Sequence, residues 1–73
     1  MKMIHPDMLK ALKEYYKPGT RVELVSMEDP YTSLRPGDMG SVTNIDSTGT
    51  VFISWDRGSS LGAVFGVDQI RKI

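Results

Sequence analysis

The sequence predicts a small, mainly β domain, in which a curled sheet of about five short strands follows one amino-terminal helix. Helical spacing of apolar residues occurs only before Gly19, and β-rich runs separated by glycine and proline follow it. The length of 73 residues fits one domain, and a chain this short buries only about 60% of its unfolded surface. We therefore expect a single domain, with the helix of residues 1–17 packed on a barrel of residues 18–73.

The helix is expected at residues 6–16. Pro6 has the fixed φ that suits a first helical position, and Pro18 disfavours helical geometry at the residue before it. The predicted apolar stripe consists of Met8, Leu12 and Tyr15 or Tyr16. The first strand is apolar on both faces, so we expect the stripe to cover the outer face of the sheet. That outer face is predicted to contain Val25, Met27 and Phe52.

The strands are expected at residues 20–27, 41–46, 50–56, 60–65 and 70–73. The third of them alternates most clearly, and Gly62 interrupts the fourth. A flat sheet of about five strands would leave two edges exposed, and curling into a barrel removes that exposure. The expected core contains Val22, Leu24, Val42, Val51, Ile53 and Ile70.

Composition excludes several classes of function. The chain has 9 Lys+Arg and 9 Asp+Glu, so a strongly basic nucleic-acid arm and an acidic disordered tail are both excluded. Without cysteine there is no disulfide framework, zinc ribbon or thiol nucleophile. His5 is the only imidazole, which leaves Ser59 and Ser60 without a plausible base for nucleophilic catalysis. We expect a non-enzymatic protein with no cofactor and no metal.

No apolar run reaches the length of a signal peptide, about 7–15 residues, or of a membrane-spanning helix, about 20 residues. We therefore expect a cytoplasmic protein without a membrane partner.

The order of the turn motifs resembles the small SH3-like barrels. The motifs are PGTRV at residues 18–22, PGDMGSV at 36–42, GTVFISWDRGS at 49–59 and GVDQI at 66–70. Through ELVSM at 23–27 and DPY at 29–31, residues 18–73 also resemble an uncharacterised family of short bacterial and phage proteins. A more distant likeness is to the mind-bomb-type SH3-like domains of ubiquitin ligases. These resemblances imply a barrel without a known activity, and they leave the helix outside.

The predicted function is binding of a protein or peptide through the long loop at residues 28–36. The candidate contact residues are Tyr31, Leu34, Arg35 and Trp55. Long loops on a rigid scaffold often carry binding residues, and aromatic and arginine side chains are typical interface anchors. For two of these residues an alternative to partner contact stays open. Trp55 follows the inward alternation of its strand, and the alternative places it in the core. For Tyr31 the alternative is packing back onto the barrel.

The alternative function is that of a nucleic-acid-associated barrel. Its candidate cations are Arg21, Arg35, Arg57, Arg71 and Lys72. Arg35 shares a loop with Tyr31, an arrangement that suits a base stacked beside a phosphate. The net charge of +0 weighs against it, because phosphate contacts dominate nucleic-acid affinity. The sequence leaves the identity of the partner and the oligomeric state open.

Overall fold

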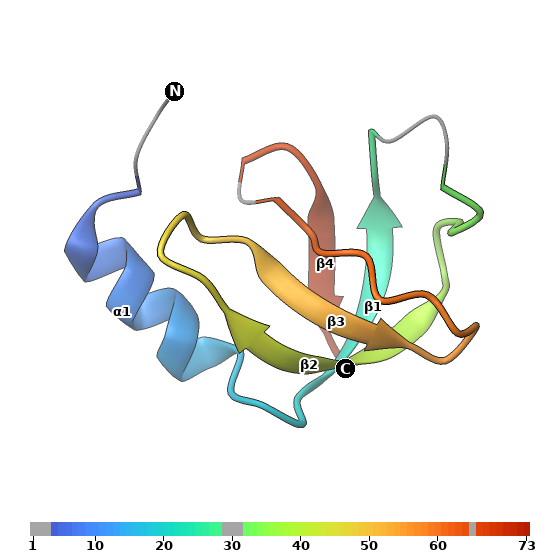
Figure 1. Cartoon of the computed structure of the whole chain (residues 1–73), viewed down its shortest axis with the longest axis horizontal. Helices are drawn as coiled ribbons and strands as arrows, with labels where there is room; N and C mark the ends of the chain where they lie inside the picture. Colours follow the sequence, from blue (N-terminus) through green and yellow to red (C-terminus); the bar gives the residue numbers. More distant parts are fainter. Residues whose placement is uncertain (1–3, 29–31, 65) are drawn as a thin grey trace.

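A computed structural model describes residues 4–28, 32–64 and 66–73. Its elements are α1 (Pro6–Tyr15), β1 (Arg21–Ser26), β2 (Met39–Ile45), β3 (Val51–Trp55) and β4 (Gln69–Lys72), shown in Figure 1. The strands form one antiparallel sheet in the order β3-β2-β1-β4. The predictions of a mainly β fold and an amino-terminal helix are confirmed.

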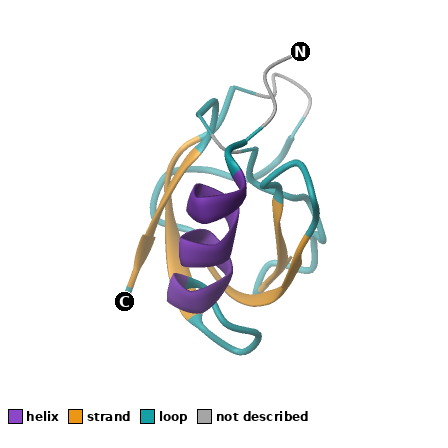
Figure 2. Cartoon of the chain, turned by 90° about the vertical axis from the view of Figure 1, so that its left-hand side faces the viewer, coloured by secondary structure: helices purple, strands orange, loops and turns teal. Residues whose placement is uncertain are grey.

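The sheet is strongly bent, so that strands lie on two sides of the molecule and α1 lies across the opening between them (Figure 2). Two interruptions of the strand register accompany the bend, one between Leu24 and Ser26 of β1 and one between Val42 and Asn44 of β2. A bulge of this kind bends a strand and increases its twist. The two bulges thus help to turn a four-stranded sheet into a trough.

The fifth predicted strand, at residues 60–65, is not confirmed. Among the described residues of this segment, only Ala63 pairs, in an isolated bridge with Val51. The two residues exchange backbone hydrogen bonds of 2.9 and 2.8 Å. The carbonyl of Leu61 instead accepts the indole N–H of Trp55 at 2.8 Å. At Leu61 this side-chain bond takes the place of a ladder contact. Phe65, the last residue of the predicted strand, lies outside the described residues.

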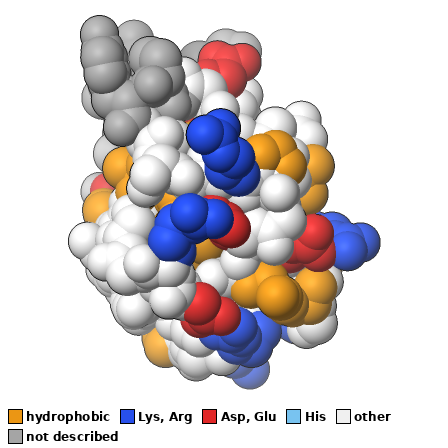
Figure 3. Space-filling model, turned by 90° about the vertical axis from the view of Figure 1, so that its right-hand side faces the viewer, with side chains coloured by type: hydrophobic (Ala, Val, Ile, Leu, Met, Phe, Trp, Pro, Cys, Tyr) orange, Lys and Arg blue, Asp and Glu red, His pale blue; other side chains and the backbone are white. Residues whose placement is uncertain are grey.

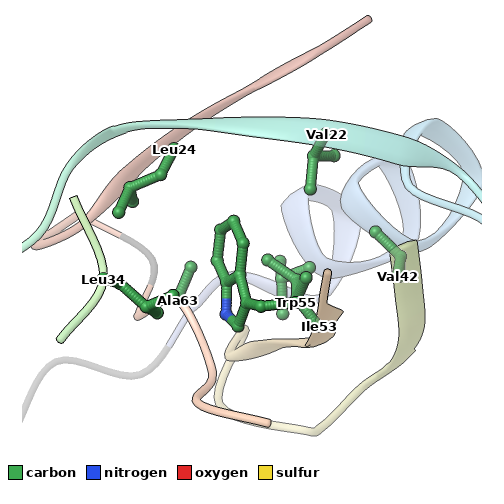
Figure 4. Close-up of a cluster of buried hydrophobic side chains, with 8 residues drawn as sticks. Val22, Leu24, Leu34, Val42, Ile53, Trp55 and Ala63 are labelled. Carbon is green, nitrogen blue, oxygen red and sulfur yellow. The ribbon is translucent and has the colours of Figure 1, made fainter. Parts of the chain in front are cut away.

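The core fills the inner side of the bent sheet (Figure 4). Its buried side chains are Val22, Leu24, Leu34, Val42, Val51, Ile53, Trp55 and Ala63. Five of the six predicted core residues are among them, and the sixth, Ile70, is partly buried against the cluster. Alternation along β1 and β3 explains this success, because every second side chain of these strands points inward.

Gly40 provides the space for this packing. In β2 it lies opposite Trp55 of β3. A Cβ at position 40 would lie 2.6 Å from Cγ2 of Ile53, 2.8 Å from the carbonyl oxygen of Ser54 and 3.0 Å from Cα of Trp55. Two of these atoms are backbone atoms that cannot rotate away, so β2 and β3 require glycine at this point.

The helix is held by part of its predicted stripe. Pro6 occupies its first turn, and Nδ1 of His5 accepts the N–H of Asp7 at 3.1 Å. Leu12 and Tyr16 pack against the core, whereas Met8 and Tyr15 are 51% and 54% exposed. The prediction that Met8 lies in the packing stripe is therefore wrong. No side chain of α1 is fully buried, and the helix is too short and too polar to cross a membrane.

Three carboxylates stabilise turns and strand ends on the surface. Oδ1 of Asp46 accepts hydrogen bonds from Oγ1 of Thr48 at 2.7 Å and from the N–H groups of Thr48 and Thr50 at 2.9 and 3.0 Å. These bonds, first that of the Thr48 hydroxyl, lower the pKa of Asp46. The pKa of Asp38 and that of Asp56 are lowered as well, by hydrogen bonds from the Arg35 backbone and from Arg21 respectively.

These lowered pKa values predict a loss of stability in acid. A carboxyl group with a depressed folded-state pKa stabilises the fold above its unfolded pKa, about 3.9. That contribution falls as the pH drops from about 5 through the lowered folded-state pKa. We expect a constant melting temperature between about pH 5 and 7 and a decline below, measured by circular dichroism. In Asp46→Asn the acid decline should be shallower, and an unchanged decline would exclude Asp46 as a contributor.

Candidate functional site

The three described residues among the four predicted to bind a partner do not share one exposed surface. Leu34 and Trp55 are 5% and 2% exposed and belong to the core. Arg35 is exposed, and its backbone N–H donates to Oδ2 of Asp38 at 2.9 Å. Tyr31 lies outside the described residues. The core alternative for Trp55 is thus the correct one, and Arg35 is the only described member of the set with an exposed side chain.

Three of the predicted cations are paired with carboxylates of the same chain. Arg21 donates to Asp56, with Nη1 2.8 Å from Oδ1, and also to Oγ of Ser41 at 3.0 Å. The other two pairs are Arg57 with Asp38, at 3.0 Å, and Arg71 with Glu23, at 2.6 Å. Figure 3 shows basic and acidic side chains next to one another on one side of the molecule. The described part of this side offers a mixed surface rather than a basic one.

An apolar groove lies between α1 and the open side of the sheet. Its volume is about 370 Å³. Its walls contain Leu12 of α1, Tyr16 at the C-terminal cap of α1, Val25 of β1, Val51 of β3, and Gln69 and Ile70 of β4. Gly49, Ala63, Val64, Gly66 and Asp68 complete the lining. The groove thus brings together residues from the helix, three strands and the segment before β4.

The groove owes its shape to a bulge and to a sparsely packed helix. Val25 is the extra residue between Leu24, which pairs with Ile70, and Ser26, which pairs with Gln69. A bulge redirects the side chain of the extra residue, and Val25 is 42% exposed in the groove wall. On the other side, Leu12 and Tyr16 reach the sheet only in part. An apolar surface is therefore left accessible between α1 and Val25 of β1.

Of the polar side chains that line the groove, Asp68 already accepts hydrogen bonds, Tyr16 is weakly ionisable and Gln69 is exposed. Oδ2 of Asp68 accepts the N–H of Val64 at 2.9 Å, and Oδ1 accepts that of Glu28 at 3.1 Å. Partial burial, together with the neighbouring Tyr15, raises the pKa of Tyr16, so its hydroxyl stays neutral. Within residues 4–28, 32–64 and 66–73 there is also no group of three or more metal-ligating side chains. The lining of this groove is more apolar than polar.

The chain matches a protein family described as a domain of unknown function (DUF4314) over residues 5–73. It belongs to this family. Comparison with the curated proteins found no match, and neither did comparison with the solved structures. The DUF4314 match begins before α1, although the resemblance seen in the sequence began only at residue 18. The groove between α1 and the sheet therefore lies within the family domain.

The sequence analysis did not predict this groove in the DUF4314 domain, although it noted one feature related to it. The apolar character of both faces of β1 predicted that Val25 and Met27 need a cover. The prediction that the helix covers an outer face with Val25, Met27 and Phe52 is not confirmed, because Leu12 and Tyr16 pack against the core cluster, as Met27 does, and Phe52 does not line the groove. The opening of the groove depends on the bulge at Val25. No local sequence pattern marks this bulge.

Proposed function

We propose that this domain is a non-enzymatic interaction module that binds a segment of another protein in the groove between α1 and the sheet. The observation that supports it is the apolar wall formed by Val25, Val51 and Ile70 on one side and Leu12 on the other. The volume of about 370 Å³ lies within the range of protein binding pockets, about 300–1,000 Å³. Burial of apolar side chains there would supply the affinity.

This proposal moves the contact surface away from the loop at residues 28–36. Leu34 and Trp55 are buried in the core, so neither presents an anchor to a partner. A role for Tyr31 and Arg35 in binding stays a prediction. The groove supports a protein partner more strongly, because it combines apolar walls with a concave shape.

The nucleic-acid alternative has weaker support. Arg21, Arg57 and Arg71 each pair with a carboxylate, so binding a phosphate would require these pairs to break. Burial of Trp55 also removes it as a surface for base stacking.

We also propose that the bent sheet is a barrel of the SH3-like type. The bridge between Ala63 and Val51 supports a fifth strand beside β3, and this strand would narrow the opening of the trough. Amide hydrogen exchange tests this idea. Slow exchange at neighbouring residues of the 60–65 segment, in addition to Ala63, is expected for a strand, and protection of Ala63 alone would leave an isolated bridge.

Two matched substitutions test the binding groove. Val25 lies in its wall and Met39 lies outside its lining, and the two are 42% and 45% exposed. Peptides selected from a random displayed library on the wild-type protein should bind Val25→Lys at least about 10-fold more weakly, because the added charge enters the apolar wall. Met39→Lys should change the affinity by less than about twofold. Calorimetric titration measures both.

Equal weakening by the two substitutions would contradict the groove as the binding site. Selection of no peptide, together with single-stranded DNA binding that weakens steeply as salt rises, would favour the nucleic-acid alternative.

A further inference from the structure

We propose that the bound segment carries a lysine or arginine together with two apolar side chains, which fill two adjacent hollows that meet at Val64 and Asp68. This inference rests on the proposed function, because one of the two hollows is the groove between α1 and the sheet. It adds a second hollow to the binding surface and gives the charge of the partner.

The second hollow adjoins the groove and has a volume of about 310 Å³. Its described lining consists of Met27, Glu28, Leu61, Gly62, Val64, Val67 and Asp68. Val64 and Asp68 also line the groove, so the two hollows meet at these residues. Val64 and Val67 are 43% and 47% exposed, and apolar surface therefore continues from one hollow into the other. A segment that fills the groove thus has a second apolar site within reach.

Hydrogen bonds fix the boundary between the two hollows. The N–H of Asp68 donates to the carbonyl oxygen of Val64 at 2.9 Å, and the N–H of Val64 donates to Oδ2 of Asp68 at 2.9 Å. Oδ1 of Asp68 accepts the N–H of Glu28 at 3.1 Å, which joins the second acidic residue to the same boundary. A surface held in this way is formed before the partner arrives, and this lowers the cost of ordering on binding.

The charged residues in the described lining of the two hollows are both acidic. They are Glu28 and Asp68, and this lining contains no lysine or arginine. The bonds to Asp68 come from uncharged N–H groups. The ion pairs of the described residues use other carboxylates, those of Asp7, Glu23, Asp38 and Asp56. A cation beside apolar side chains therefore complements this surface, whereas an acidic segment would be repelled.

A second copy of the chain matches this surface less well than another protein does. Arg71 and Lys72 lie between Ile70 and Ile73, a stretch that combines basic and apolar residues. Arg71 is paired with Glu23 at 2.6 Å, and Ile70 already lines the groove of its own chain. These contacts engage the stretch in the folded protein, so a segment of another protein is the occupant that we infer.

A charge reversal tests the charge of the partner. The probe is the tightest peptide that the displayed library yields on the wild-type protein, and the selected peptides should be enriched in lysine and arginine. This peptide should bind Glu28→Lys at least about threefold more weakly. Glu14→Lys is the matched control, because Glu14 is exposed on α1, lines neither hollow and gives the same change in net charge. The control should change the affinity by less than about twofold.

A compensating change in the peptide tests the contact itself. A copy of the peptide with glutamate in place of its basic residue should bind Glu28→Lys more tightly than it binds the wild type. Calorimetric titration measures both affinities.

A second pair of variants tests the second hollow. Val67 lines this hollow alone and Met39 lines neither, and the two are 47% and 45% exposed. The peptide should bind Val67→Gln at least about threefold more weakly, because an apolar contact is lost. Met39→Gln should change the affinity by less than about twofold. Circular dichroism checks that all variants fold.

The outcomes separate this inference from the proposed function. Wild-type affinity of Glu28→Lys or of Val67→Gln, with Val25→Lys still impaired, would overturn the inference and leave the groove as the binding site. Selection of acidic peptides would overturn it as well. So would concentration-dependent dimers of the wild type that Val67→Gln abolishes in sedimentation velocity, because the occupant would then be a second copy. If the library yields no peptide, the proposed function fails and this inference fails with it.

Discussion

Truncation of Ile53 to alanine is expected to lower the free energy of unfolding by about 2–5 kcal/mol. The side chain is 1% exposed, and Cγ2 lies next to Gly40 in the neighbouring strand. Removing it leaves a cavity between β2 and β3, which their backbones cannot fill without breaking the ladder. A small domain has a total stability of about 5–15 kcal/mol, so the loss is a large fraction of it.

Urea denaturation followed by circular dichroism measures this effect. Ile73→Ala is the matched control, because the same side chain is 55% exposed at the end of the chain. The control should change the free energy of unfolding by less than about 0.5 kcal/mol. Equal midpoints for the wild type and Ile53→Ala would contradict the assignment of Ile53 to the core.

Removal of residues 1–17 is expected to leave a folded sheet that associates. The deletion uncovers apolar surface at Val51 and Ile70, which α1 shields through Leu12 and Tyr16. It also uncovers the free edge of β4, and natural proteins commonly protect such edges with a helix. We expect sedimentation velocity to show dimers or larger species. The free energy of unfolding should fall by about 1–3 kcal/mol, the scale of one buried large apolar side chain.

Point variants in the full-length chain distinguish two effects of the deletion: loss of the apolar contacts of α1 and shortening of the chain. Leu12→Ser with Tyr16→Ser should reproduce the association, because these side chains contact the core. Met8→Ser with Tyr15→Ser should not, because both side chains are more than half exposed. A shortened chain as stable and as monomeric as the parent would show that α1 is a tether or a partner-binding element.

The sequence was sufficient to predict the elements that depend on local patterns. Strict alternation in β3 and the glycine-containing turns predicted the strands, and Pro6 with Pro18 bracketed the helix. The segment at residues 60–65 was harder to predict, because it forms an isolated bridge at Ala63 instead of a regular ladder. Gly62 and the bond from Trp55 to the Leu61 carbonyl accompany this irregularity. Which side of the helix packs also depended on tertiary contacts: Tyr16 was one of two predicted alternatives, and Met8 was assigned to the wrong side.

The candidate site was less predictable than the fold. Loop position and residue type suggested Leu34 as an anchor, but the chain turns back so that Leu34 closes the core. Its N–H donates to Oγ1 of Thr32 at 3.1 Å, a local turn within that segment. The groove arises instead from the bulge at Val25 and from the position of α1. Both are consequences of how distant segments pack, and neither has a local signature.

The single tryptophan of the chain provides an internal optical probe. Trp55 is buried, and its indole N–H is bonded to the Leu61 carbonyl, so its emission should be blue-shifted in the folded state and red-shifted on unfolding. The indole proton has its own NMR signal. Its exchange with deuterium would therefore report the detachment of residues 57–61 from the core, separately from the exchange of β-sheet amides that report global unfolding.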